Sequence, residues 1–244
     1  MANYNKLLSS FLRRFSEYIA LKTNLYLSYK PDFQTKLNKI PDWDYLYKFW
    51  IKNSPNNEKG DLVRLYFLIN QIEYIKKNNI SGIIAEVGVF KGTTARLFHH
   101  SFPNRRLLLF DTFEGFDERD INHKKENSNA KSGGWNSSLK DVKDFVGSSE
   151  LVQFLSGYFP DTTKNVDPNY RYALVHLDAD LYNPQISGLE YFYQRVVEGG
   201  VIIIHDCNNE YFGSRSALDE FFSNKPETPI IIPDKSGSAI VIKL

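Results

Sequence analysis

The chain has 244 residues, 42% of them hydrophobic and 24% charged, which is enough to bury a substantial core in one large domain. Its formal net charge of +1 lacks the basic excess typical of nucleic-acid-binding proteins. A single cysteine excludes an intrachain disulfide, and no apolar stretch approaches the ~18 residues that span a bilayer, so we expect a cytoplasmic protein.

Residues 1–60 differ in pattern from the rest of the chain. Helices are predicted over Leu7–Leu21 and Trp43–Ile51, prolines interrupt the sequence between and after them, and no strand is evident. We expect a helical extension that either caps the site or forms a contact in a homo-oligomer. The main domain is predicted over residues 61–244, and its first element is an amphipathic helix over Asp61–Asn78.

Apolar runs of strand length alternate with helix-compatible segments from Ser81 onward. The runs are Ile83–Val87, Leu107–Phe110, Leu151–Leu155, Ala173–Leu177 and Val201–Ile204. The helical segments are Gly92–His100, Ser138–Phe145, Pro184–Val197 and Ser214–Ser223. Because the runs are apolar at successive positions, both faces of each strand should be covered, as in a parallel sheet between helices. The tail adds a predicted antiparallel pair, so we predict an α/β, Rossmann-like, doubly wound and mostly parallel sheet that ends in an antiparallel strand.

The interval Asp117–Gly134 is long, polar and weakly patterned. Loops of this length in compact domains are typically lids, binding loops or disordered segments. The overlapping segment Ser132–Ser138 (SGGWNSS) is a candidate to flank an adenine ring.

Polar residues stand at or near the ends of four predicted strands. They are Glu86 and Gly88, then Asp111 with Thr112, then Asp178, and finally His205 with Asp206. Since the carboxyl ends of parallel strands lie on one edge of a sheet, where ligands bind, we expect these residues to share a cleft. Asp180, by contrast, is predicted to cap the helix that follows it.

The first strand-to-helix turn, EVGVFKGTTA, has the features of a ligand-binding turn. Gly88 and Gly92 allow close approach of the backbone, and Thr93 and Thr94 open the next helix with its free N–H groups. The spacing is not the dinucleotide fingerprint G-x-G-x-x-G. Asp111, at the second strand end with Thr112 beside it, is placed to bind ribose hydroxyls, so the turn predicts a ligand with an adenosine.

The motifs EVGVFKGTTA, FDTFEGF, GYFPDT, HLDADLY and GGVIIIHD, followed by GSRSALDEF, resemble the macrocin O-methyltransferase family. These are class I, S-adenosylmethionine-dependent, metal-assisted enzymes that methylate sugar hydroxyls. The resemblance covers about Gly82–Leu244. It implies that Glu86, Gly88 and Asp111 hold the cofactor and that Asp178 is a metal ligand and general base. It also implies further metal ligands at the end of the GGVII strand.

The sequence departs from the family pattern at that last position. The family commonly has two adjacent acids, whereas this chain has His205–Asp206. Three interpretations of His205 stay open: a metal ligand that shifts preference from magnesium toward manganese, the general base itself, or a structural histidine.

The resulting hypothesis is methyl transfer to a sugar hydroxyl of a small molecule or glycoside. A divalent ion on Asp178 and Asp206 would lower the pKa of the hydroxyl, and Asp178 or His205 would accept its proton. An NAD oxidoreductase is the rival, although the turn lacks the glycine that admits a pyrophosphate. A non-catalytic adenosine-binding subunit is the third hypothesis.

Overall fold

The computed structural model describes residues 43–55, 60–126, 129–147, 149–207 and 213–244, and parts of a helix between residues 11 and 22. The chain divides into two compact units, Met1–Pro41 and Asp42–Leu244. The described positions between 11 and 22 are helical, in agreement with the predicted Leu7–Leu21 helix, whose first residues lie outside the described ones. The predicted role of residues 1–60 as a cap or oligomer contact stays a prediction.

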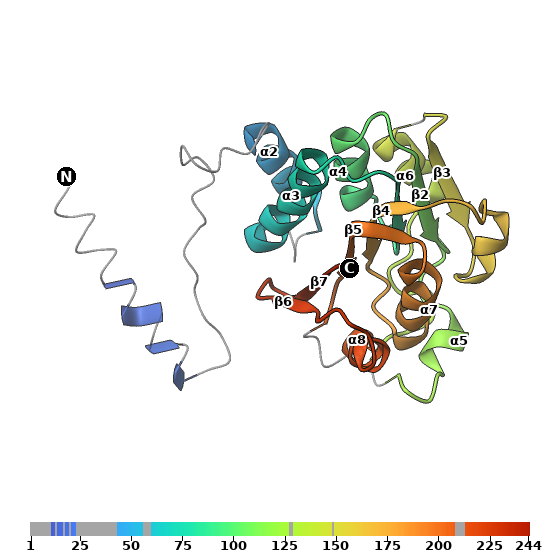
Figure 1. Ribbon diagram of the computed structural model, residues 1–244. Helices are drawn as coiled ribbons and strands as arrows, with labels where there is room; N and C mark the ends of the chain where they lie inside the picture. The colour runs from blue at the N-terminus through green and yellow to red at the C-terminus, as the bar shows by residue number, and fades with distance from the viewer. Residues whose placement is uncertain are drawn as a thin grey trace. The chain divides into compact units, whose positions relative to one another are not determined.

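The larger unit is built around a seven-stranded sheet with helices on both faces (Figure 1). The strand order is β3-β2-β1-β4-β5-β7-β6, in which β1 to β5 are parallel and β7 runs antiparallel to both of its neighbours. The bounds are β1 Ile83–Val87, β2 Leu107–Asp111, β3 Val152–Ser156, β4 Tyr172–Leu177, β5 Val196–Ile204, β6 Ile230–Ile232 and β7 Ser238–Ile242. The predicted doubly wound sheet with an antiparallel C-terminal strand is confirmed.

The helices form the two outer layers. One face carries α2 (Trp43–Asn53), α3 (Leu62–Lys77), α4 (Thr93–Ser101) and α6 (Leu139–Val146) (Figure 1). The other carries α5 (Glu118–Ile121), α7 (Tyr182–Tyr193) and α8 (Ser214–Phe222), and the 3₁₀ helix η1 (Asp161–Asn165) follows β3. Every residue of β4 is buried between the two helical layers, which accounts for its mostly apolar sequence.

The start of β5 differs from its prediction. The helix predicted to reach Val197 ends at Tyr193, and β5 begins at Val196. The ladder to β4 shifts register here, from Tyr172 opposite Val196 to Leu174 opposite Val201. Gly199, at φ +72°, lies in this bulge, so the two glycines that precede the predicted strand lie inside β5.

The described residues of the polar interval 117–134 include regular structure. The interval contains α5, whose N-cap is Asp117, and its described end pairs with the segment after β2. Gly133 N donates to Phe116 O at 3.1 Å, and Phe116 N donates to Gly134 O at 3.0 Å. The loop therefore returns to the sheet edge where β2 ends.

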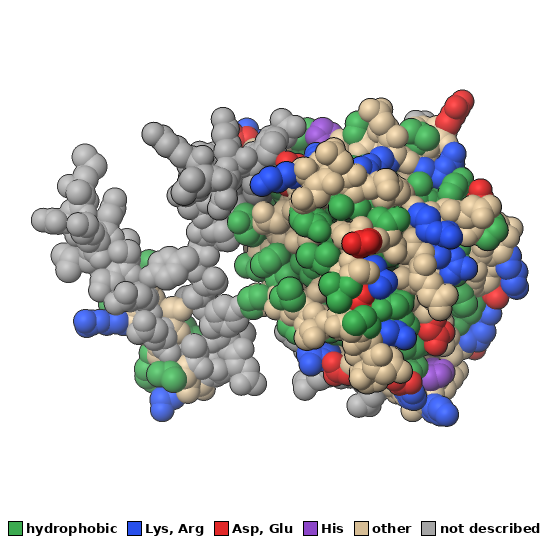
Figure 2. Space-filling view, in the orientation of Figure 1, with side chains coloured by type: hydrophobic (Ala, Val, Ile, Leu, Met, Phe, Trp, Pro, Cys, Tyr) green, Lys and Arg blue, Asp and Glu red, His purple; other side chains and the backbone are tan. Residues whose placement is uncertain are grey.

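The surface of the larger unit is mixed in charge. On the face drawn in Figure 2, the described acidic and basic side chains are interspersed, which agrees with the near-zero net charge. None of the helices in the described part of the chain has the length and apolar character needed to cross a membrane.

Candidate active site

Four neighbouring parallel strands bring the predicted polar residues to one edge of the sheet. Gly88 N donates to Phe110 O at 2.9 Å, and Asp178 N donates to Val87 O at 2.8 Å. His205 N donates to Leu177 O at 2.9 Å. These bonds extend the ladders one step beyond the strands, so the residues after β1, β4 and β5 are held in register. The predicted convergence on one sheet edge is confirmed, whereas the expected single cleft is divided into two cavities.

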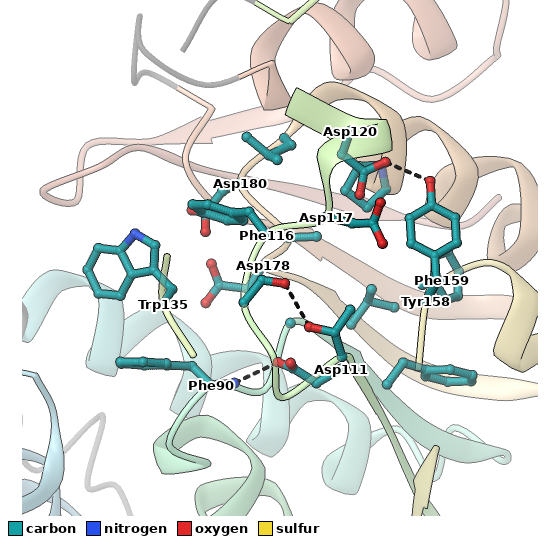
Figure 3. Close-up of a pocket in the computed structure, with 18 of the residues that line it drawn as sticks. Phe90, Asp111, Phe116, Asp117, Asp120, Trp135, Tyr158, Phe159, Asp178 and Asp180 are labelled. Carbon is teal, nitrogen blue, oxygen red and sulfur yellow. Dashed lines mark hydrogen bonds between the residues drawn. The ribbon is translucent and has the colours of Figure 1, made fainter. Parts of the chain in front are cut away.

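A first cavity of about 100 Å³ lies beside the end of β2 (Figure 3). Asp111 stands in its wall, and its carboxylate accepts from three backbone N–H groups: Val89 at 2.7 Å, Phe90 at 2.9 Å and Phe113 at 2.6 Å. These bonds fix the carboxylate but leave acceptor capacity, because two oxygens carry about four lone-pair sites. The aromatic lining is Phe90, Phe110, Phe116, Trp135, Tyr158 and Phe159. Aromatic rings beside fixed carboxylates can contact the base and the ribose of a nucleoside.

Gly88 lies where this cavity meets a second one, and its lack of a side chain is required there. Its φ is +83°, and a Cβ at this position would overlap the backbone carbonyl of Asp178. The turn after β1 can therefore lie directly against the end of β4. Close approach of the two backbones places Asp178 beside the first cavity.

The second cavity, of about 230 Å³, is charged. It is lined in part by Arg64, Glu86, Lys91, Asp178, Asp180 and Asp206. Arg64 comes from α3, and its Nη2 lies 2.5 Å from Asp178 Oδ2, with the two side chains 3% and 20% exposed. The N-terminus of α3 is itself fixed, because the Asp61 carboxylate accepts hydrogen bonds from Arg64 N at 2.9 Å and from Lys235 N at 2.8 Å. A buried cation is thus anchored against the acid that ends β4.

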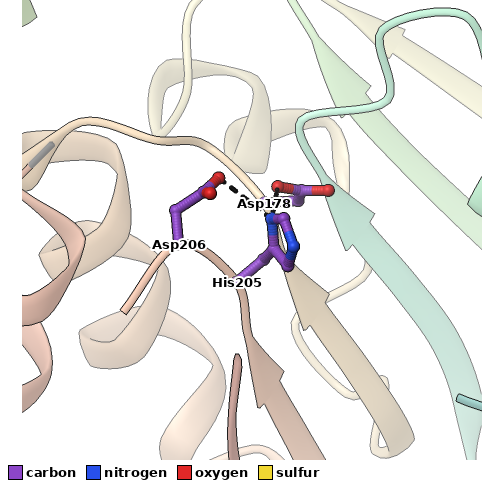
Figure 4. A group of neighbouring side chains, drawn as sticks. All are labelled: Asp178, His205 and Asp206. Carbon is purple, nitrogen blue, oxygen red and sulfur yellow. Dashed lines mark hydrogen bonds and ion pairs between the residues drawn. The ribbon is translucent and has the colours of Figure 1, made fainter. Parts of the chain in front are cut away.

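Asp178, His205 and Asp206 form a compact group (Figure 4). His205 Nδ1 lies 2.9 Å from Asp178 Oδ1 and 2.9 Å from Asp206 Oδ2. Burial and Arg64 would lower the pKa of His205, but the two carboxylates outweigh both and raise it to about 10. Burial would raise the pKa of Asp178, but His205 and Arg64 hold it well below its usual value. The metal-free group therefore contains an imidazolium between two carboxylates.

The same three residues fit a divalent ion. Their ligand atoms lie within 4.8 Å of one another. Metal–ligand bonds of about 2.1 Å at right angles place neighbouring ligand atoms roughly 3 Å apart, close to the 2.9 Å separations here. Two carboxylates with one imidazole suit manganese or a similar transition ion better than magnesium, which prefers oxygen.

Glu86 is the buried acid inside β1. It is 1% exposed, and its Oε1 lies 2.9 Å from His176 Nδ1, on the neighbouring strand. Burial, followed by the charge of Asp178, raises the pKa of Glu86 well above its usual value, and burial lowers the pKa of His176 to about 3. The two side chains form a buried hydrogen-bonded pair, and Glu86 lines the second cavity.

Comparison with known proteins gives the family. The family model for macrocin O-methyltransferase matches residues 60–239. The chain belongs to the macrocin O-methyltransferase family. An 8-demethyl-8-(2,3-dimethoxy-alpha-L-rhamnosyl)-tetracenomycin-C 4'-O-methyltransferase from Streptomyces olivaceus is 29% identical in an alignment of 158 residues, and the match covers 59% of this chain and 60% of that protein.

Two further similar proteins, one curated sequence and one solved structure, are also O-methyltransferases. A demethyldecarbamoylnovobiocin O-methyltransferase from Streptomyces niveus is 26% identical over 55% of this chain and 56% of that protein, so the chain matches less than two thirds of either curated relative. The solved structure of the O-methyltransferase NovP shares the fold, with a TM-score of 0.71 and 20% identity over 82% of this chain and 97% of that chain. The class I methyltransferase fold expected from the sequence is confirmed.

The other predicted cofactor residues divide between the cavities. Thr112 lines the first cavity, where its Oγ1 donates to Gly115 O at 2.8 Å, and Thr93 and Thr94 line the second. Gly92 lines neither cavity. It is the N-cap of α4, and a Cβ there would meet Val146 of α6 at 2.7 Å, so its place is explained by helix packing.

The prediction that Asp180 caps the next helix is wrong. The N-cap of α7 is Leu181, and no side chain caps it. Asp180 has φ +60° and lines both cavities (Figure 3). The left-handed backbone turns it out of the capping position and toward the site.

Sequence analysis missed Arg64. The residue shares a helix face with Leu68, Ile72 and Ile75, all of them buried. A single charge on an otherwise apolar helix face was the available signal, because a buried arginine requires a partner. The sequence alone did not indicate which carboxylate that partner would be.

Proposed function

We propose that this chain transfers a methyl group from S-adenosylmethionine to a hydroxyl of a sugar carried by a small molecule. The observation that carries the proposal is the junction of the two cavities at Gly88, Asp178 and Asp180. A slot lined by aromatic side chains and by Asp111 opens there onto a charged cavity with a metal-type ligand set. The names of the two curated relatives describe O-methyltransferases, one of which acts on a rhamnosyl compound.

The cofactor is assigned to the first cavity and its border with the second. Asp111 would accept the ribose hydroxyls, and Glu86 would face the amino group of the methionine moiety. The N–H groups at the start of α4, near Thr93 and Thr94, would face its carboxylate. When bound, this cofactor supplies an electrophilic methyl group, and the new C–O bond forms as the S–CH₃ bond breaks.

The metal is assigned to Asp178, His205 and Asp206. A divalent ion held there would lower the pKa of a coordinated sugar hydroxyl. Arg64 keeps Asp178 ionised and oriented from the side opposite His205. With a pKa of about 10 in the metal-free chain, His205 carries a proton at neutral pH, so it is not a free base there, and a metal ion would have to displace that proton before the imidazole could act as a ligand.

The proton acceptor is assigned to Asp180. Both oxygens of Asp178 are engaged, one by Arg64 and one by His205, and its pKa is low, so it is a weak base. Asp180 lines both cavities next to the point where acceptor and cofactor would meet, and its side chain is hydrogen-bonded to Asp206. Its left-handed backbone holds it at that junction.

Transfer of tritium from S-adenosyl-[methyl-³H]methionine to rhamnosides and sugar nucleotides tests the proposal. We expect turnover that requires Mn²⁺ or Mg²⁺. Asp180→Asn should lose more than a hundredfold in kcat while still binding metal, a typical range for a general base. Asp206→Asn should lose metal affinity instead. Undiminished turnover in excess EDTA would remove the metal role.

Two rival functions give different results in binding experiments. Binding of NAD but not of S-adenosylhomocysteine would favour the oxidoreductase, and cofactor binding with no turnover on any acceptor would favour the non-catalytic subunit.

A further inference from the structure

The junction of the two cavities is also where strained backbone gathers. Four of the six non-glycine residues with positive φ in the described part of the chain line a cavity: Phe90 (+49°), Trp135 (+59°), Asp180 (+60°) and Asp206 (+58°). For an aromatic residue this conformation costs on the order of 1–2 kcal/mol, and it tends to persist where it serves a function. Asp180 and Asp206 have roles proposed above, whereas Phe90 and Trp135 have none.

Trp135 is the largest exposed side chain at the site. It is 46% exposed, it borders both cavities, and its ring meets Phe90 edge-on, with centroids 5.2 Å apart and an interplanar angle of 79°. Figure 3 shows the two rings on one side of the pocket, with Asp178 and Asp180 across from them. An indole beside carboxylates presents an apolar surface next to hydrogen-bond acceptors.

The position of Trp135 is fixed by the chain on either side of it. Ser137 Oγ donates to Phe90 O at 2.7 Å, and Ser137 N donates to Phe113 O at 3.2 Å. On the other side, Gly134 O accepts from Phe116 N at 3.0 Å. The backbone around Trp135 is therefore tied to both the β1 turn and the segment after β2, and the indole packs edge-on against Phe90.

We propose that Trp135, supported by Phe90, is the platform on which the sugar ring of the acceptor stacks, which rests on the proposed function. A pyranose has an apolar face of C–H groups and a rim of hydroxyls. Stacking of that face on the indole directs rim hydroxyls toward Asp178 and Asp180. The adenine of the cofactor is assigned to the first cavity, where it would lie beside Phe116, Tyr158 and Phe159. These three side chains line only the first cavity, whereas Trp135 also lines the second.

The test separates sugar binding from cofactor binding. The probe is methyl α-L-rhamnopyranoside, followed by saturation-transfer-difference NMR on protein saturated with S-adenosylhomocysteine, whose own affinity is measured by calorimetry. The variant is Trp135→Asn, because asparagine tolerates the left-handed backbone while removing the ring. Trp135→Phe restores a ring, and Tyr45→Ala removes an aromatic side chain that is 47% exposed and lines neither cavity.

We expect Trp135→Asn to bind the rhamnoside about tenfold more weakly, the upper range for an aromatic contact. Trp135→Phe and Tyr45→Ala should stay within about threefold of wild type, and S-adenosylhomocysteine affinity should change little in all three. The platform would be overturned if Trp135→Asn bound the rhamnoside as tightly as wild type does, or if wild type did not bind it. It would also be overturned if Trp135→Asn lost affinity for S-adenosylhomocysteine in parallel. The last would assign Trp135 to the adenine. Failure of wild type to bind S-adenosylhomocysteine at all would instead overturn the proposed function.

Discussion

The ion pair between Arg64 and Asp178 allows a quantitative test of the electrostatics of the site. Their charged atoms lie 2.5 Å apart, with the two side chains 3% and 20% exposed. Arg64→Met keeps an unbranched apolar stem near Trp50 but removes the cation. Removing one partner of a buried ion pair costs about 3–5 kcal/mol. Because Asp178 keeps its contact with His205 in this variant, we expect a loss at the lower end, about 3 kcal/mol in the free energy of unfolding.

A matched exposed pair provides the control. Arg215 Nε lies 2.9 Å from Asp219, and these side chains are 47% and 60% exposed. Arg215→Met should cost less than about 1 kcal/mol, because solvent screens an exposed pair. Both variants are measured by urea unfolding at pH 7 in EDTA. Equal losses in the two variants would refute the view that Arg64 stabilises a buried carboxylate, and Asp178→Asn added to Arg64→Met should recover part of the loss.

Three further predictions concern the glycine turn, the imidazolium and the metal. Gly88→Ala should lower the free energy of unfolding and the affinity for S-adenosylhomocysteine far more than Gly133→Ala. Both glycines have positive φ, but the nearest contact of a Cβ at Gly133 is 3.8 Å away, whereas a Cβ at Gly88 would overlap Asp178. Similar losses in the two variants would contradict that overlap. In EDTA, the free energy of unfolding of wild type relative to His205→Gln should fall as the pH rises from 6.5 through 10. The pKa of His205 is raised to about 10 in the folded chain, so its protonation stabilises the fold fully only below the unfolded pKa of 6.5. A difference between the two proteins that is independent of pH would contradict this. Mn²⁺ must displace the His205 proton, so calorimetry in buffers of different ionisation enthalpy should show about one proton released per ion at pH 7. His205→Asp, which restores two adjacent acids, should abolish that release and bind Mg²⁺ more tightly; unchanged release in this variant would place the titrating group elsewhere.

The convergence of Asp111, Asp178 and His205 could be predicted from the sequence because it follows from strand direction alone. Each residue comes directly after an apolar run, and parallel strands place all such positions on one edge. The convergence therefore needed no knowledge of side-chain contacts. The resemblance then suggested chemical roles for these positions.

Features that depend on tertiary contacts could not be predicted in the same way. Arg64 reaches Asp178 from a helix more than a hundred residues earlier in the chain, which no local pattern encodes. The early start of β5 depends on a bulge around Gly199, whereas the strand was predicted to begin at Val201. Asp180 was assigned to a cap by its place before a helix, but its left-handed backbone directs it to the site.

A crystal structure of the chain with S-adenosylhomocysteine and Mn²⁺, measured with X-rays at the manganese absorption edge, tests the shared site most directly. We predict one anomalous peak among Asp178, His205 and Asp206, with the ribose of the ligand on Asp111 and its sulfur facing the junction at Gly88. Manganese bound elsewhere, or the ligand bound away from Asp111, would contradict the account.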